Sequence, residues 1–379
     1  MANTLTSLIP TVIKSLDKIS REQIGFIHAV NRDSSAEMVA LDQSITIPVA
    51  PVASTADNTP GVTAPDTGDQ TIGNTTMTMS RSKHVAIRWN GEEVKGLQGA
   101  GAYMGLVEKR FEQAFRALGN AIEADLAGQH IYASRAYGTA GTTPFGTAGD
   151  FTDFSNVARI LKDNGAPPAY NLVLGNKSEA NLKGKQSSLF KVNEAGTAGL
   201  LRDGMIDRLM GFGLHYSGQV LTNTAGTGAS YLINEAGGYA VGDTSLTLDT
   251  GTGTILAGDV ITVGNFKYVV KTALAANVVV IQAPGLREAV ANNATVTVNA
   301  AAERNVAIGD GAIYLATRAP AMPEGGDASN GDVEYVTDAN TGLVYEIAHY
   351  RQFRQVVTHV AIAWGYKTVK PEHVALLLG

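Results

Sequence analysis

A regular apolar stripe runs through the stretch from about residue 103 to 133. Its large apolar side chains recur at steps of three or four residues, in the series Met104, Val107, Phe111, Phe115, Leu118, Ile122 and Leu126. The charged residues of the stretch fall on the other faces, and they are Glu108, Lys109, Arg110, Glu112, Arg116 and Glu123. This spacing predicts one long amphipathic helix. At 1.5 Å per residue it is on the order of 45 Å long, so we expect it to be a beam against which other elements pack.

Low charge and the lack of cysteine narrow the class of protein. The 379 residues carry 29 Lys+Arg against 35 Asp+Glu, which gives a net charge of −6, and only 17% of them are charged. No apolar run approaches the about 18 residues needed to span a bilayer. Zero cysteine excludes disulfides, thiolate metal ligands and cysteine nucleophiles. An acidic chain without a Lys/Arg cluster is also a poor candidate for holding nucleic acid by its phosphates. Because no basic segment precedes a hydrophobic one at the N-terminus, we expect no secretory signal and a cytoplasmic origin.

Two strand patterns flank a long connection that has no basic residue. Apolar residues keep one odd-numbered phase through Ile45, Ile47, Val49, Met77, Met79, Val85, Ile87 and Trp89, which predicts the two arms of a hairpin over 43–90. Residues 50–76 between them contain no Lys or Arg and are rich in Thr, Ala, Pro, Gly and Asp. Such a loop cannot pack by itself, so it is either disordered or ordered by a partner. Ahead of the hairpin, an apolar stripe from Leu5 to Ile27 predicts a helical arm within residues 1–42.

The rest of the chain indicates an α+β domain interrupted by a β-rich unit. Over 151–225 the pattern predicts a helix around Val157 to Leu161, a strand at 172–174, a short helix from Asn176, a third helix over Leu200 to Met210 and a following strand. Between 226 and 303, five short runs of β-forming residues are separated by Gly-Asp, Gly-Asn and Asn-Asn turns, at 245–248, 260–263, 266–270, 278–281 and 296–298. These runs predict a small barrel or sandwich. Strands return over 304–379, with Asp338 to Gly342 as a hairpin turn.

No motif carries the spacing of a catalytic or ligand-binding site. The seven histidines are never closer than ten residues to each other, and the chain has no Gly-x-Ser-x-Gly elbow. Gly99 and Gly101 lack the third glycine at 104 that a dinucleotide loop requires. We therefore predict no catalytic, cofactor-binding or metal-ligating residue and no enzymatic activity.

The order of these elements resembles that of the major capsid protein of tailed bacteriophages, the Hong Kong 97-type fold, in the short-tailed-phage subtype with an inserted β domain. Residue-level similarity is clearest at 201–208 leading into Gly211-Phe212, at 246–248 through 258–261, and at 361–365 through 370–372. The resemblance implies an α+β chain with a fixed series of parts: an N-terminal arm at 1–42, an extended hairpin loop at 43–90, a peripheral domain at 91–150, an axial domain at 151–225, an inserted β-barrel at 226–303, and a second axial and peripheral part at 304–379.

The same resemblance implies a structural function. Copies would assemble into hexamers and pentamers of an icosahedral head, in the bacterial cytoplasm, and the head would enclose double-stranded DNA without reading its sequence. Its implied partners are further copies, a separate scaffolding protein and a portal protein, with a decoration protein left open and no membrane. An encapsulin-type shell is the alternative within the fold, and a β-rich surface hydrolase or adhesin is the alternative from another class.

Five residues of the hairpin loop are candidates for subunit contacts. The basic residues Arg81, Lys83 and Arg88 follow this connection, which has no Lys or Arg of its own. They can pair with acidic neighbours, or they are solvated charges at strand ends. Val62 and Ile72 are two of the few sizeable apolar groups within it. We therefore expect Val62 and Ile72 to be covered by a neighbouring copy.

Overall fold

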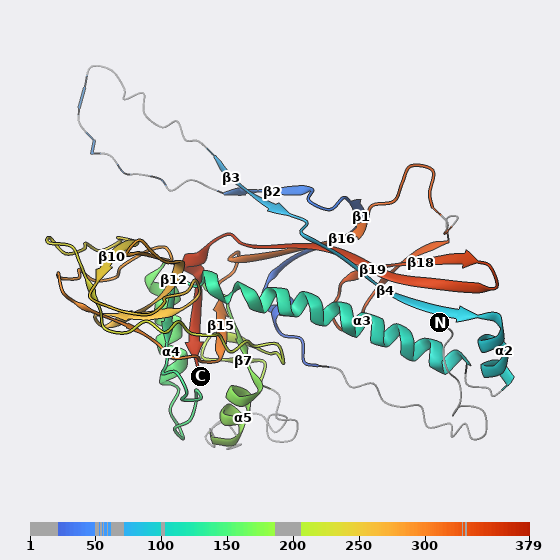
Figure 1. Cartoon of the computed structure of the whole chain (residues 1–379), viewed down its shortest axis with the longest axis horizontal. Helices are drawn as coiled ribbons and strands as arrows, with labels where there is room; N and C mark the ends of the chain where they lie inside the picture. Colours follow the sequence, from blue (N-terminus) through green and yellow to red (C-terminus); the bar gives the residue numbers. More distant parts are fainter. Residues whose placement is uncertain are drawn as a thin grey trace.

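The computed structural model describes residues 22–49, 53, 55, 57–58, 60–61, 72–99, 103–185, 206–327, 329 and 332–379. Its longest helix, α3 (Tyr103–Ala127), continues as a 3-10 helix, η1 (Gly128–Tyr132). The long helix is thus confirmed, and its last turn tightens where Gly128 lowers the preference for an α-helix. Figure 1 shows α3 running along the molecule beneath the strands.

A six-stranded mixed sheet lies on one side of α3. Its strands are β1 (Asn31–Val39), β16 (Ile313–Pro320), β19 (Gln355–Thr368), β18 (Val344–Gln352), β17 (Val333–Thr337) and β4 (Arg81–Asn90). The strand β19 pairs antiparallel with β4 over its first ten residues, from Gln355↔Asn90 to Trp364↔Arg81. The predicted turn at Asp338 to Gly342 joins β17 to β18.

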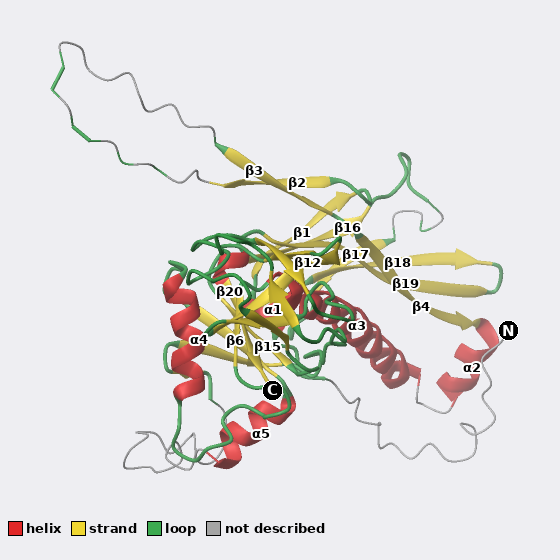
Figure 2. Cartoon of the chain, turned by 60° about the vertical axis from the view of Figure 1, so that its left-hand side comes forward, coloured by secondary structure: helices red, strands yellow, loops and turns green. Residues whose placement is uncertain are grey.

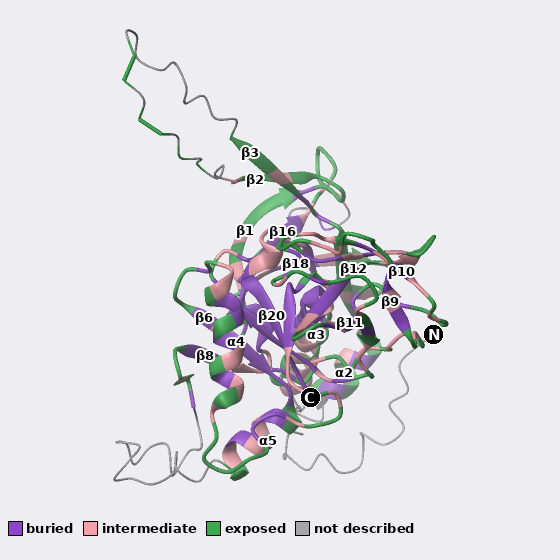
Figure 3. Ribbon diagram, turned by 90° about the vertical axis from the view of Figure 1, so that its left-hand side faces the viewer, coloured by how far each residue is buried: buried purple, intermediate pink, exposed green. Residues whose placement is uncertain are grey.

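A second group of strands forms the body beside the C-terminus. These strands are β5 (Arg135–Tyr137), β20 (Val374–Leu378), β15 (Arg304–Ile308), β6 (Tyr170–Leu174), β8 (Phe212–Tyr216) and β7 (Arg208–Leu209). The helices around the body and the six-stranded sheet are α1 (Phe26–Ala29), α2 (Gly91–Gly99), α4 (Thr152–Asp163), α5 (Asn176–Lys185) and the 3-10 turn η3 (Pro371–His373). Every residue of β20 and β15 is buried, which places the centre of the core there (Figure 3).

Six strands of the β-rich stretch pair as a closed ring. In ring order they are β11 (Val260–Val263), β14 (Thr295–Val298), β9 (Tyr231–Ile233), β10 (Ser245–Asp249), β13 (Val278–Ile281) and β12 (Phe266–Ala275), and β12 pairs back with β11. All five predicted runs are strands of this ring. A separate apolar cluster fills it, including Leu248, Tyr268 and Ile281. The pairing of β12 with β5 joins the ring to the body.

The predicted hairpin over 43–90 is correct for its first two strands, and it is wrong for the stretch that follows them. Strands β2 (Ser44–Val49) and β3 (Gly73–Thr78) pair antiparallel and project above the body (Figures 1 and 2). The following stretch, 81–90, leaves the hairpin and becomes β4 of the six-stranded sheet. The partner strand β19 lies more than 260 residues away in sequence, so local alternation could not reveal this change of sheet.

Two helix predictions differ from the structure. Most of the predicted N-terminal arm lies outside the described residues, and the end of its apolar stripe falls in the short helix α1. Its later part, Asn31–Val39, is an edge strand instead, because β16 offers it a parallel partner. The third helix over 200–210 lies outside the described residues up to 205 and is wrong at Arg208–Leu209, which pairs with β8. Met210 and Gly211 have φ of 51° and 88°, and this tight turn reverses the chain instead of continuing a helix.

Candidate assembly surfaces

The base of the β2–β3 hairpin is fixed to the six-stranded sheet. Met77 and Met79 are buried in a small cluster with Ala363, and Ile45 and Ile47 pack against it. The Met79 N–H donates to the Gln43 carbonyl at 2.9 Å. The hairpin therefore begins from a rigid support.

A glycine lets the hairpin cross β19 at close range. A Cβ at Gly365 would overlap the carbonyl oxygen of Thr78 and lie 3.1 Å from Met79 Cα. Two residues further along β19, the Lys367 Nζ donates to the Thr76 carbonyl at 2.8 Å. Contact between these two backbones is possible because residue 365 has no side chain.

The structure places four of the five predicted contact residues. Ile72 precedes β3 and is 72% exposed. Arg81 Nε lies 3.5 Å from Asp125, and Lys83 lies over the ring of Trp364 at 5.7 Å. Arg88 also interacts within the chain, and Val62 lies outside the described residues. Arg81 and Lys83 thus contact α3 and β19 of their own chain. A role of any of the five residues between subunits stays a prediction.

A carboxylate on α3 clamps the start of the described chain. Glu123 is fully buried, and its oxygens accept the N–H groups of Gly25 at 2.6 Å, Phe26 at 2.7 Å and Ile27 at 3.0 Å. The sequence prediction placed Glu123 on a polar face and was wrong. A buried carboxylate is tolerated here because three backbone donors at the start of α1 solvate it.

A second contact reinforces the clamp nearer the surface. Glu22 accepts hydrogen bonds from Arg116 Nε at 2.6 Å and from Asn120 Nδ2 at 2.7 Å. These bonds lower the pKa of Glu22 to about 2. The sequence analysis did not predict the contact between Glu123 and the start of α1. The one local sign of it is the helical spacing of Glu123, which lies four residues after Gly119 and three before Leu126, both on the buried face of α3.

An apolar groove lies at the end of the molecule that carries α2 and the tips of β18 and β19. The N-terminal half of α3, the end of β4 and the β18–β19 hairpin enclose a hollow of about 650 Å³. Its apolar lining includes Trp89, Tyr103, Val107, Phe111 and Val356. In Figure 1 this end, marked by α2 and the tips of β18 and β19, lies away from the β2–β3 hairpin and the strand ring.

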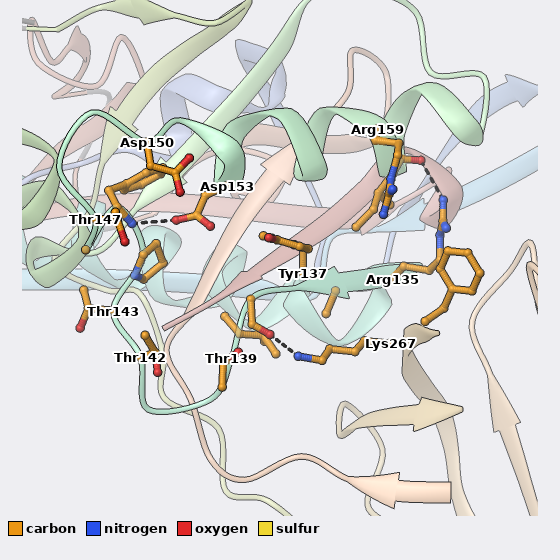
Figure 4. Close-up of a pocket in the computed structure, with 18 of the residues that line it drawn as sticks. Arg135, Tyr137, Thr139, Thr142, Thr143, Thr147, Asp150, Asp153, Arg159 and Lys267 are labelled. Carbon is orange, nitrogen blue, oxygen red and sulfur yellow. Dashed lines mark hydrogen bonds between the residues drawn. The ribbon is translucent and has the colours of Figure 1, made fainter. Parts of the chain in front are cut away.

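A polar cleft lies between the body and the strand ring (Figure 4). It has a volume of about 370 Å³, with Asp150 and Asp153 towards one end and Arg159 and Lys267 towards the other. The Asp153 carboxylate accepts the Phe145 N–H at 2.7 Å, and Lys267 donates to the Gly138 carbonyl. No histidine, serine or cysteine is among the residues that line it.

No protein-family model and no curated protein matches the sequence. Among solved structures, "Capsid structure of the Cyanophage P-SCSP1u" aligns at a TM-score of 0.52 and 10% identity, over 100% of this chain and 95% of that one. The chain has the fold of that capsid chain. A structure of Mycobacterium phage Che8 aligns at a TM-score of 0.46 and 14% identity, over 99% of this chain and 98% of that one. Of the helices in the described part of the sequence, none is both long and apolar enough to cross a membrane.

Proposed function

We propose that this chain is the major capsid protein of a tailed bacteriophage, with the Hong Kong 97-type fold. The observation that carries the proposal is the shared fold with the cyanophage capsid chain, which extends over the whole length of this chain. In this proposal the protein is structural and not an enzyme. Its place is the virion capsid, and many copies form hexamers and pentamers around packaged DNA.

The shape of the subunit supports self-assembly. A rigidly based hairpin, β2–β3, projects from the sheet, and an apolar groove lies at the other end of the molecule. A protein that carries a projection and a separate concave surface can associate head to tail, and such contacts close into rings. We assign β2–β3 and its connection, 43–90, as the extended loop that reaches over a neighbouring copy.

The other parts follow the same assignment. The helix α3 is the spine of a peripheral domain at 91–150, and 151–225 with 304–379 supplies the axial domain and the return to the periphery. The strand ring, with its own apolar cluster, is the inserted β-barrel at 226–303. Expression of 226–303 alone tests this boundary, because an independent domain gives dispersed amide resonances and a disordered fragment contradicts it.

The proposed partners are a separate scaffolding protein and a portal protein. Expression of the chain alone and together with the candidate scaffold, followed by light scattering and negative-stain electron microscopy, tests the function. Uniform round shells support the capsid assignment. A stable small oligomer under every condition removes it, and a shell that encloses an enzyme cargo would favour the encapsulin alternative.

A deletion tests the extended loop separately. Removal of residues 54–72 leaves both strands of the hairpin base, so we expect a folded subunit that assembles poorly. Normal shells from this deletion would contradict the role of the loop while leaving the capsid assignment intact.

A further inference from the structure

The turn between β18 and β19 exposes a phenylalanine at the end of two long strands. Phe353 is 91% exposed, more than any other large apolar side chain in the described part of the chain. The turn is rigid: Gln352 pairs with Gln355, Arg354 has a φ of 55°, and the Arg354 carbonyl accepts the Gly91 N–H at 3.1 Å. A fixed turn of this kind holds Phe353 away from the surface of its own chain.

The apolar groove lies directly beside this turn. Val356 on β19 and Tyr103 on α3 are among the residues that form its wall, and Trp89 is held inside by edge contact with Tyr103 at 5.9 Å between ring centroids. Arg110 covers one face of the Trp89 ring at 5.0 Å. A preformed aromatic hollow next to an exposed aromatic side chain is typical of a protein–protein contact.

Charge at the same end is complementary. A second hollow of about 490 Å³ adjoins the groove, and Glu92 and Arg354 are among its lining residues. Both side chains are exposed, and neither forms an ion pair among the described residues. Each copy therefore presents a cation on the turn next to Phe353 and an anion on α2 beside the same second hollow, so this end is self-complementary in charge. The groove itself is also lined by Arg351 and Arg354.

We propose that Phe353 of one copy inserts into the groove of a second copy, with its Arg354 facing Glu92 of that copy. The inference rests on the proposed shell function and names one contact within it. Every copy carries both the turn and the groove, so the contact can close as a two-fold pair or as a ring. Because the turn is already rigid, little conformational freedom is lost when it docks.

Substitution of Phe353 tests the contact. In F353S the turn loses its apolar anchor, and we expect the subunit concentration needed for assembly to rise at least about tenfold, since burial of a Phe side chain stabilises by about 1.5–3 kcal/mol and about 1.4 kcal/mol is tenfold. F353L retains apolar area and should assemble closer to the wild type. V241S, at another exposed apolar site on the strand ring, is the matched control and should assemble normally.

A charge exchange tests the partner surface. R354E and E92K should each impair assembly, and the double variant R354E/E92K should restore it. Thermal unfolding of the isolated subunits should be unchanged in all variants, because the pair joins different copies. A lowered unfolding temperature in R354E that the double variant reverses would place the pair within one copy and overturn the inference.

The two proposals fail separately. Wild-type shells together with F353S shells at the wild-type concentration overturn the Phe353 contact and leave the capsid function standing. A wild-type chain that never associates removes the function and the contact together.

Discussion

The buried clamp between α3 and the start of the described chain makes a sharp prediction about stability. One oxygen of Glu123 accepts two backbone N–H groups and the other accepts one. In E123Q the amide oxygen can still accept two donors, but the amide nitrogen then faces the N–H of Ile27. One charge-assisted hydrogen bond is lost and two donors oppose each other.

The magnitude follows from these three bonds. A hydrogen bond to a charged group contributes about 1.5–3 kcal/mol, and a buried donor left unpaired costs about 1–3 kcal/mol. We expect E123Q to lower the free energy of unfolding by about 2.5–6 kcal/mol, the sum of these two effects. E123L leaves all three N–H groups unpaired and should cost more, which is a large fraction of the about 5–15 kcal/mol of a typical protein.

Urea unfolding, followed by tryptophan fluorescence, measures the change. E112Q on the same helix is the matched control, because Glu112 forms a surface ion pair with Lys109 and no other among the described residues. Its loss should cost under about 1 kcal/mol. Hydrogen exchange adds a local readout, since the amides of Gly25, Phe26 and Ile27 should lose protection in E123Q. Wild-type unfolding and unchanged exchange in E123Q would refute the clamp.

Three further predictions concern other parts of the fold. G365A should push β3 away from β19, cost about 1–3 kcal/mol and speed proteolysis within residues 50–76, whereas G73A, whose Cβ would lie 3.8 Å from the nearest atom, should do neither. The rings of His28 and His215 stack with their centroids 6.4 Å apart, and burial lowers the pKa of each below its usual 6.5. As the pH drops below about 6.5, the unfolded chain binds protons before the folded chain does, so the free energy of unfolding should fall. The urea midpoint should fall less over this pH range in H28Q/H215Q, and an equal fall would contradict the prediction. R304M should be neutral or stabilising in the same assay, because burial lowers the pKa of Arg304 to about 10 against the attraction of Asp259, and its three guanidinium nitrogens have no hydrogen-bond partner among the described residues. A loss of several kcal/mol would contradict this and show that the attraction to Asp259 outweighs the cost of burial.

Most of the correct fold predictions came from the local spacing of apolar residues in the sequence. The stripe from Met104 to Leu126 marks α3, and the alternating runs between 245 and 298 mark five strands of the ring. The turn at 338–342 was also readable, because Asp338 accepts the N–H of Thr341 and Gly342 has a φ of 68°. Each of these signals lies within a few residues of the structure it specifies.

Most of the predictions that failed depended on distant partners. Asn31–Val39 has a polar sequence and becomes a strand only because β16, some 280 residues later, supplies its edge. The same holds for Glu123, whose burial requires backbone donors about 97 residues earlier. The miss at Arg208–Leu209 has a local cause instead, because the turn at Met210 and Gly211 folds this pair back onto β8. The candidate contact at Phe353 was missed for a related reason, since exposure of a single aromatic has no sequence pattern.

One strand fixes the spacing between the two candidate assembly surfaces. The hairpin β2–β3 crosses β19 at Gly365, and the exposed turn precedes its first residue, Gln355. Ten residues separate these points, which is about 33 Å along a strand. This stretch of β19 pairs with β4 on one side and with β18 and β16 on the other. A strand bonded on both sides cannot stretch or slip without breaking two ladders, because a shift of one residue would turn every side chain to the opposite face. The distance between these two surfaces within a copy is therefore constant. In the proposed shell, a change of curvature must then come from the angles between copies.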